Sequence, residues 1–197
     1  SSPGIDDQSS SNDDQITITD TAVVINEDSD SIDFRVESDG DANALMVDGS
    51  GDKVGIGIAV PEGKLHIFTG DASVGPNAHA DELVIEGSAN SGISILSGAS
   101  SNGRIMFGDS GDDDIGYIEY DHSNNALGLG VNTTTKLKID SNGHILPGSD
   151  DAQDLGSGSL QFRDIYTGDL NLNNTRHRAN EVDGTSGSWT IQEGDDN

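Results

Sequence analysis

The chain has 197 residues, and its 36 Asp and Glu against 9 Lys and Arg give a formal net charge of −27 at pH 7. So acidic a surface repels DNA, RNA and anionic membranes, which argues against nucleic-acid binding and membrane insertion. The chain has no cysteine and only 4% aromatic residues. Disulfides and thiolate metal sites are therefore excluded, and a single copy has little with which to build a core.

The opening residues are mainly Ser, Asp, Asn and Gln, which predicts a flexible leader or linker over 1–14. From residue 15 onward, short apolar runs with a period of two residues predict β-strands, each with one apolar and one polar face. These runs include Ile16–Ile18, Ile32–Val36, Leu65–Ile67, Leu83–Ile85, Ile93–Ile95, Ile105–Phe107, Leu127–Leu129, Leu137–Ile139 and Trp189–Ile191.

Dipeptides that accept positive φ punctuate these runs and predict tight turns. They are Asp39-Gly40, Asn102-Gly103, Asn142-Gly143 and Asp183-Gly184. No stretch of ten or more residues has apolar groups at helical spacing, so we expect almost no helix. The segment from Asp154 to Tyr166 could hold at most one helical turn.

The chain repeats itself weakly. Val36–Asp39 followed by Asn43–Leu45 matches Ile118–Asp121 followed by Asn125–Leu127, an offset of 82 residues from Val36 to Ile118. Repeated hairpins favour an elongated object over a globule. We expect three β-rich modules, over 15–70, 71–145 and 146–197, in a piece of a longer polypeptide.

Four segments carry a resemblance to phage tail fibres. Val54-Gly-Ile-Gly-Ile-Ala-Val-Pro-Glu-Gly-Lys-Leu-His-Ile67 resembles one module of such fibres. Gly116–Leu127, Lys138–Gly143 and Ile145–Tyr166 are similar to further modules, in the same order along the chain. Together they cover roughly residues 40–170, and the resemblance implies a trimeric, β-rich virion fibre.

The expected fold is all-β, with short strands and hairpins stacked along a fibre axis in an intertwined homotrimer, because trimerisation buries apolar residues that one chain cannot bury. The expected function is that of a structural component of a phage tail fibre in the virion, as a spacer or in host attachment. Its partners would be further copies and other tail or baseplate proteins, with a host surface glycan or receptor as a further candidate. A bacterial surface adhesin or secreted filament is the first alternative, and a polysaccharide-degrading tail spike is the second.

We expect no enzymatic activity, no cofactor and no catalytic, cofactor-binding or metal residues. Acid pairs are so frequent that none identifies a hydrolase dyad. Asp39–Asn43 copies the opening of an EF-hand loop, but Ala44 and Ser50 stand where that loop needs Gly and Glu. Asp109–Asp114 is the densest carboxylate run, for which we weigh a specific calcium site against loosely bound counter-ions.

A few other residues have a functional and a structural interpretation. His66 and His144 could chelate a metal on a three-fold axis, or be ordinary strand and turn histidines. The basic cluster Arg176-His177-Arg178 could hold an anion, or pair with acidic neighbours. Gly55 and Gly57 are expected to share a strand face and to allow close packing at an axis or a neighbouring chain, or else merely to lie in turns or face solvent. Asn132-Thr-Thr and Asn173-Asn-Thr are glycosylation sequons.

Overall fold

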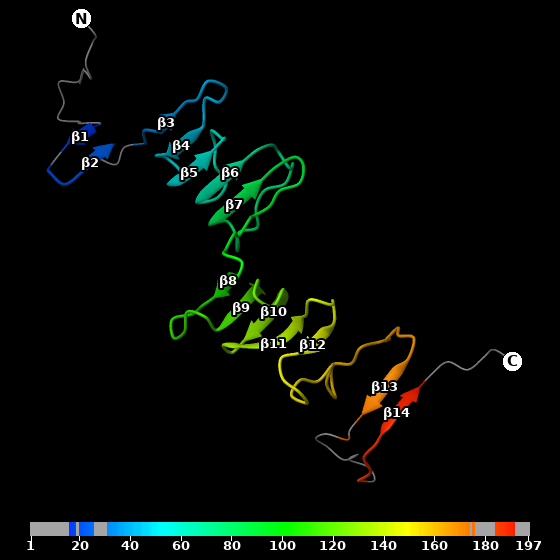
Figure 1. Ribbon diagram of the computed structural model, residues 1–197. Helices are drawn as coiled ribbons and strands as arrows, with labels where there is room; N and C mark the ends of the chain where they lie inside the picture. Colours follow the sequence, from blue (N-terminus) through cyan, green and yellow to red (C-terminus); the bar gives the residue numbers. More distant parts are fainter. Residues whose placement is uncertain (1–15, 19, 26–30, 174, 176–183, 192–197) are drawn as a thin grey trace, which may run out of the picture. The chain divides into compact units, whose positions relative to one another are not determined.

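The computed structural model describes residues 16–18, 20–25, 31–173, 175 and 184–191. Within these residues the protein contains fourteen β-strands and no helix (Figure 1). The all-β prediction is therefore confirmed. No helix that could cross a membrane is found among the described residues.

Two five-stranded sheets form the central part of the chain. The first has the order β3-β4-β5-β6-β7 and the second the order β12-β11-β10-β9-β8. The strands of the first are β3 (Phe34–Val36), β4 (Leu45–Asp48), β5 (Lys53–Ile56), β6 (Leu65–Phe68) and β7 (Leu83–Glu86). Those of the second are β8 (Asn102–Phe107), β9 (Gly116–Asp121), β10 (Ala126–Val131), β11 (Thr134–Ile139) and β12 (Ile145–Pro147).

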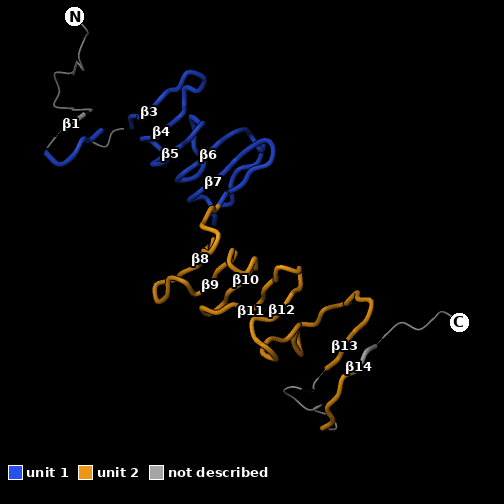
Figure 2. The backbone as a smooth tube through the Cα atoms, viewed as in Figure 1, with its two compact units in different colours: residues 1–94 blue, residues 95–197 orange. Residues whose placement is uncertain are grey.

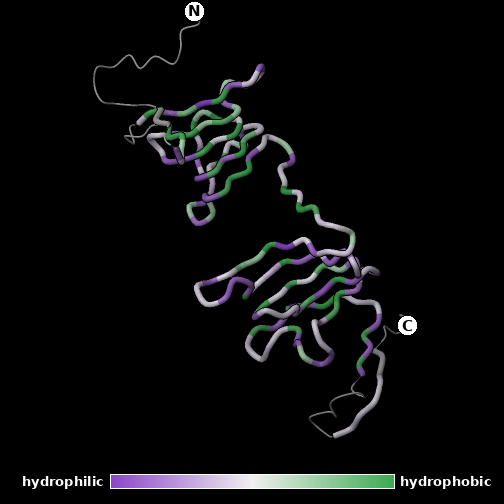
Figure 3. Tube along the Cα trace, turned by 60° about the vertical axis from the view of Figure 1, so that its left-hand side comes forward, coloured by the Kyte–Doolittle hydropathy of each residue, from purple (hydrophilic) through white to green (hydrophobic). Residues whose placement is uncertain are grey.

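Two further strand pairs lie outside these sheets. β1 (Ile16–Ile18) pairs with β2 (Val23–Ile25), and β13 (Leu170–Asn173) pairs with β14 (Ser188–Ile191). Neighbouring strands are antiparallel throughout, except that β5 pairs with β6 and β6 with β7 in parallel. Figure 3 shows that hydrophobic residues gather in the strands, whereas the connecting turns are mostly hydrophilic.

The chain divides into two compact units, residues 1–94 and 95–197, each holding one five-stranded sheet (Figure 2). This corrects the expected modules. A boundary after residue 70 would separate β6 from β7, which pair in parallel, and a boundary after residue 145 would cut β12. Parallel pairing needs a long connection, here residues 69–82, and such pairing leaves no local signal in the sequence. The expected leader, 1–14, lies outside the described residues.

Most of the predicted strands form, with two corrections. The run Ile93–Ile95 has no regular structure and its side chains are exposed; Ile95 lies beside Gly103 of β8 but makes no ladder pair with it. Asn102-Gly103 opens β8, paired with Asp121 and Tyr120, and so makes no turn. The segment from Asp154 to Tyr166 contains no helical turn.

The turn predicted at Asn142-Gly143 is confirmed. Gly143 has φ +85°, and its N–H donates to the carbonyl of Asp140 at 2.9 Å between β11 and β12. Asp39-Gly40 lies in the loop between β3 and β4, where the Ser38 N–H donates to the Asp41 carbonyl at 2.8 Å. Gly184 has φ +71°, whereas Asp183 lies outside the described residues.

Candidate assembly faces and polar groove

One side of the first sheet is made only of apolar side chains, and we call it face 1. Because side chains alternate along a strand and paired residues point the same way, the strand register puts ten apolar residues on this side. They are Phe34, Val36, Leu45, Val47, Val54, Ile56, Leu65, Ile67, Leu83 and Ile85. None is buried, and Leu83 is 50% exposed. Face 1 therefore lacks a covering layer in the single chain.

The second sheet has the same property on one side, which we call face 2. Its register aligns eleven residues: Ile105, Phe107, Ile118, Tyr120, Leu127, Leu129, Val131, Leu137, Ile139, Ile145 and Pro147. Ile145 is 69% exposed and Phe107 is 55% exposed. Thr134, which pairs with Val131, and the Tyr120 hydroxyl are polar groups on face 2, but no charged side chain stands on it. Two separate sheets thus each present an uncovered apolar wall.

The opposite side of the first sheet is covered by residues 57–64, which connect β5 to β6. A Cβ on Gly55 would lie 2.7 Å from the carbonyl oxygen of Ile58 and 3.0 Å from Cγ of Pro61, so this connection packs directly on β5. Met46 and Pro61 are buried here, and apart from Pro61, Met46 is the only buried large apolar side chain among the described residues. The small core of the first unit therefore lies on the side away from face 1.

His66 belongs to this covered side and has no exposed surface. Its Nδ1 accepts a hydrogen bond from the Glu62 N–H at 3.2 Å. Its Nε2 lies 3.0 Å from a carboxylate oxygen of Glu86, but the two groups are not aligned for a hydrogen bond. His66 is therefore closed off from any symmetry-related copy, which corrects the hypothesis of a metal on a three-fold axis at this residue.

The two glycines singled out in the sequence have different roles. Gly55 lies within β5, and its close backbone contact is with the chain's own connection rather than with an axis. Gly57 lies beyond the end of β5 with φ +77°, and a Cβ there would be 2.5 Å from the Phe68 carbonyl oxygen. Gly57 therefore serves a turn, the second of the two interpretations left open by the sequence.

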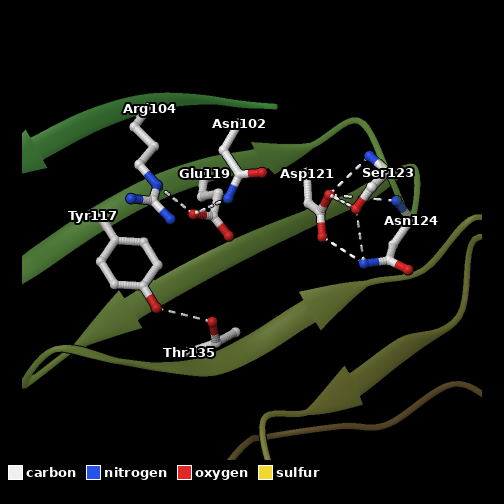
Figure 4. Close-up of polar contacts among 8 residues, drawn as sticks. All are labelled: Asn102, Arg104, Tyr117, Glu119, Asp121, Ser123, Asn124 and Thr135. Atoms are coloured by element: carbon white, nitrogen blue, oxygen red, sulfur yellow. Dashed lines mark hydrogen bonds and ion pairs between the residues drawn. The ribbon is translucent and has the colours of Figure 1, made fainter. Parts of the chain in front are cut away.

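The side of the second sheet opposite face 2 is polar (Figure 4). Glu119 of β9 accepts hydrogen bonds from Nδ2 of Asn102, at 2.8 Å, and from Nε of Arg104, both on β8. The Tyr117 hydroxyl lies 2.9 Å from Oγ1 of Thr135. The Tyr117 ring crosses β10 at Gly130, where any Cβ would collide with it. These polar contacts tie β8, β9 and β11 together, and the Tyr117 ring passes over β10 between them.

A groove of about 360 Å³ runs along this polar side. Its floor is β10, whose small residues Ala126 and Gly128 leave the space open. Its lining includes Glu119, Asp121, Asn124, Thr135, Lys138 and Asp140. Three carboxylates and one ammonium group face the groove, so it suits neither an anion nor an apolar ligand.

Aspartates at strand ends cap the turns that follow them. Asp121 accepts hydrogen bonds from the N–H and hydroxyl of Ser123, at 2.8 and 2.5 Å, and from Nδ2 of Asn124 at 2.6 Å (Figure 4). These bonds, that of the Ser123 hydroxyl first, lower the pKa of Asp121 from 3.8 to about 2. Asp121 is therefore held as a carboxylate by the turn that it caps.

Asp48 and Asp140 act in the same way. Asp48 accepts the N–H groups of Ser50 and Gly51 at 2.9 and 2.8 Å. Its pKa is lowered, chiefly by the side-chain hydrogen bond from Ser50. Asp140 accepts the N–H groups of Asn142 and His144, both at 2.9 Å, and the second of these is the main cause of its lowered pKa.

The candidate calcium segments are also turns. In the loop between β8 and β9, Asp109 accepts the N–H groups of Gly111 and Asp112 at 2.7 and 3.1 Å. One carboxylate oxygen from each of Asp112, Asp113 and Asp114 lies within 4.8 Å of the other two. The pKa of Asp114 is raised, first because its protonated side chain can share a hydrogen bond with the Asp112 carboxylate. The expectation of no metal-binding residue here stays a prediction, as does the choice between loosely bound counter-ions and a specific calcium site.

The remaining candidates are scattered. In the EF-hand-like stretch, Asp41 accepts the Asn43 N–H at 2.7 Å. His144 is exposed and its Nδ1 lies 3.2 Å from Oδ2 of Asp140, and neither its interpretation as a turn histidine nor that as an axial metal ligand is tested by this contact. The cluster Arg176–Arg178 lies outside the described residues. The sequon residue Asn132 sits with Thr133 in the two-residue turn between β10 and β11.

Sequence reasoning did not find the polar groove or the role of the aspartates. The groove has only a faint signal, the alternation of small residues in Ala126-Leu-Gly-Leu-Gly130. The aspartates that cap turns have a clearer sequence signal, which is an Asp at the end of an apolar run followed two or three residues later by Ser, Asn or Gly. No family model, curated protein or solved structure matches this chain.

Proposed function

We propose that this protein is a structural component of a phage tail fibre or a similar virion appendage, assembled as a homotrimer around a fibre axis. The observation that carries the assembly is the pair of predominantly apolar, uncovered faces, face 1 and face 2. The assignment to a virion appendage comes from the four sequence modules. Those modules form the β5–β6 connection, the β9–β10 hairpin, the β11–β12 turn and the segment after β12.

The energy of the exposed faces supports assembly. Burying a large aliphatic side chain completely contributes about 1.5–3 kcal/mol, so covering one that is already half-buried contributes about 1 kcal/mol. A face of ten such residues then offers on the order of 10 kcal/mol, which is comparable with the roughly 4–15 kcal/mol that association costs. Because each chain has two such faces, the free energy gained by burying them exceeds the cost of association.

The charge distribution supports contact through these faces. The chain has a net charge of −27, and copies that met through charged surfaces would have to bury like charges. Faces 1 and 2 contain no charged side chains. Contact through them leaves the carboxylates in solvent, where salt screens them within about 10 Å at 0.1 M ionic strength.

The number of strands fits three copies. Five strands at about 4.8 Å make a wall roughly 24 Å wide, and three such walls in a triangle lie about 7 Å from the axis. Stacked sheets lie about 10 Å apart, so the side chains of one sheet fill about 5 Å. Three inward-facing apolar walls therefore nearly fill the space between them. Two copies packed face to face would also cover the faces, so the number must be measured.

Sedimentation equilibrium of the full chain tests the proposal. We expect a mass three times that of the 20.4 kDa chain, with no concentration-dependent return to monomer near neutral pH. A stable monomer or dimer would contradict the trimer. Immunogold labelling of particles and cells that carry the protein tests the location. Label on a virion appendage supports the proposal, whereas label on a bacterial surface, or release of sugar from host polysaccharide, supports one of the alternatives.

A further inference from the structure

Residues 154–166, which we call the clasp segment, have a definite conformation without any strand or helix. Gly156 has φ +87°. The Ser157 N–H donates to the Leu160 carbonyl at 2.8 Å, and the Leu160 N–H donates to Oγ of Ser157 at 3.0 Å. The chain thus doubles back on itself, and the segment borders a concave space of about 490 Å³ that includes Phe162.

The clasp segment turns its apolar side chains outward. Five of its thirteen residues are large and apolar, and their exposed fractions run from 59% to 92%. They are Leu155, Leu160, Phe162, Ile165 and Tyr166. A turn that exposes so many apolar groups needs a covering surface, since monomeric proteins rarely leave such patches open.

The same unit already contains a matching surface, face 2. Face 2 and the clasp segment are both exposed in the single chain, so neither covers the other within one copy. Every copy of the protein supplies both surfaces in equal number. The clasp segment carries only three charged residues, Asp154, Arg163 and Asp164, and the last two pair with each other at 3.0 Å. Its contact with a face that has no charged groups is therefore mainly apolar.

Chain topology indicates which copy is met. The clasp segment follows β12, which is an edge strand of the second sheet, and β8 is the other edge. In a closed ring of like copies, the β12 edge of one copy comes next to the β8 edge of the following copy. The apolar residues of face 2 on that edge are Ile105 and Phe107, which are 45% and 55% exposed.

We propose that the clasp segment of each copy lies against Ile105 and Phe107 in β8 of the neighbouring copy. This inference rests on the proposed homotrimer and adds the residues that close its second unit. The contact is heterologous, because the clasp segment of one copy meets a strand of the next copy rather than another clasp segment. Three copies can therefore form a closed ring in which every clasp segment and every β8 face is covered.

The absence of cysteine makes a direct test possible. The test is the full-length double variant Ile165→Cys, Phe107→Cys, oxidised and run on a denaturing gel without reductant. We expect covalent dimers and trimers, because a disulfide forms only between Cβ atoms about 3.5–4.5 Å apart. The matched control pairs Ile165→Cys with Met106→Cys, one residue along β8 and on its opposite side; this pair should remain monomeric on the gel. Each single variant should do the same.

Sedimentation of the reduced double variant separates the hypothesis of the clasp contact from that of the homotrimer. Trimers with covalent oligomers from the first pair alone support the clasp. Four results from a trimeric protein would overturn the clasp and leave the proposed function standing. They are an internal disulfide alone, cross-links from a single variant, equal yields from both pairs, and no disulfide at all. A chain that sediments as a monomer overturns both, once the unsubstituted chain has been shown to do the same.

Discussion

The backbone N–H of Glu62 donates a hydrogen bond to Nδ1 of His66 at 3.2 Å, and this bond ties the β5–β6 connection to the strand that it leads into. The His66 ring is fully buried and packs edge-on against Phe68, with ring centroids 5.8 Å apart. Met46, the main apolar contributor to the small core, lies on the same covered side. This buried contact acts together with the bond that Lys53 Nζ donates to the Pro61 carbonyl at 3.0 Å to hold the connection on the sheet.

Replacement of His66 by Phe tests this contact. The variant keeps a ring but removes the acceptor, and a buried N–H without a partner costs about 1–3 kcal/mol. We expect the free energy of unfolding to fall by about that amount in urea denaturation, and hydrogen exchange in the peptide 57–64 to accelerate. The exposed His79→Phe should change neither quantity. Unaltered exchange in 57–64 would show that the connection is held by other contacts.

The assembly faces are tested by two neighbouring residues with nearly equal exposure. Ile105 and Met106 are 45% and 41% exposed, and they lie on opposite sides of β8. Ile105→Glu places a charge in face 2, so we expect trimers to dissociate in sedimentation velocity. Met106→Glu adds the same charge on the polar side and should leave the trimer intact. Equal behaviour of the two variants would argue against face 2 as the buried side.

The aspartate caps predict acid sensitivity. The pKa of Asp121 is lowered from 3.8 to about 2, so its contribution to stability is complete above about pH 4 and is lost as the pH falls through about 2. Asp121→Asn should therefore melt at a lower temperature than the parent chain at pH 7, and the difference should shrink towards pH 2. Asp39→Asn is the control, since no hydrogen bond or ion pair holds the Asp39 side chain within the described part of the chain. A difference independent of pH would indicate lost geometry rather than lost charge.

The turn between β10 and β11 contains a strained residue. Asn132 and Thr133 have φ of +51° and +60°, a left-handed turn in which a β-branched residue is disfavoured and glycine is preferred. Thr133→Gly should raise the free energy of unfolding by about 0.5–1 kcal/mol, the relief of strain less the entropy of glycine. Gly143→Ala, at φ +85° with no atom near its Cβ position, should lower it by about 1 kcal/mol. Thermal melting of both variants checks the opposite signs.

Gly57 predicts a larger loss. A side chain there meets both a left-handed backbone and the Phe68 carbonyl, so Gly57→Val should destabilise the chain by about 2–4 kcal/mol. Gly92 has open space around it and an ordinary φ, and Gly92→Val should be nearly neutral. Denaturant titration of both variants measures the contrast. An unchanged midpoint for Gly57→Val would mean that the backbone can relax at this turn.

The two-residue period of apolar side chains was sufficient to predict the strands and the side of the sheet on which each residue lies, because alternation is a local property. Phe34 and Val36 do share a face, as their register with Val47 and Leu45 requires. The pairing of β6 with β7 could not be predicted, since nothing local links residues separated by a long connection. For the same reason His66 could be placed on a strand but not beneath residues 57–64.

Turn chemistry was predictable only in part. Asn142-Gly143 and Asn102-Gly103 look alike in the sequence, yet only the first makes a turn. Asp140 stands at the start of the first and caps it, whereas Asn102 is held in β8 by ladder pairing and by Glu119. The deciding groups are a capping carboxylate in one case and a neighbouring strand in the other.

The Asp-capped turns imply an order of events during synthesis. Each cap joins groups only two to four residues apart, so hairpins can close within microseconds while the chain is still alone. In the proposed homotrimer, faces 1 and 2 are covered only after copies collide, a step whose rate depends on chain concentration. Between the two stages the protein passes through preformed hairpins with adhesive, unprotected sheets. The yield of assembled protein then depends on the competition between correct association and aggregation. Rapid dilution would slow the encounter of copies, whereas synthesis of neighbouring chains on one message would speed it.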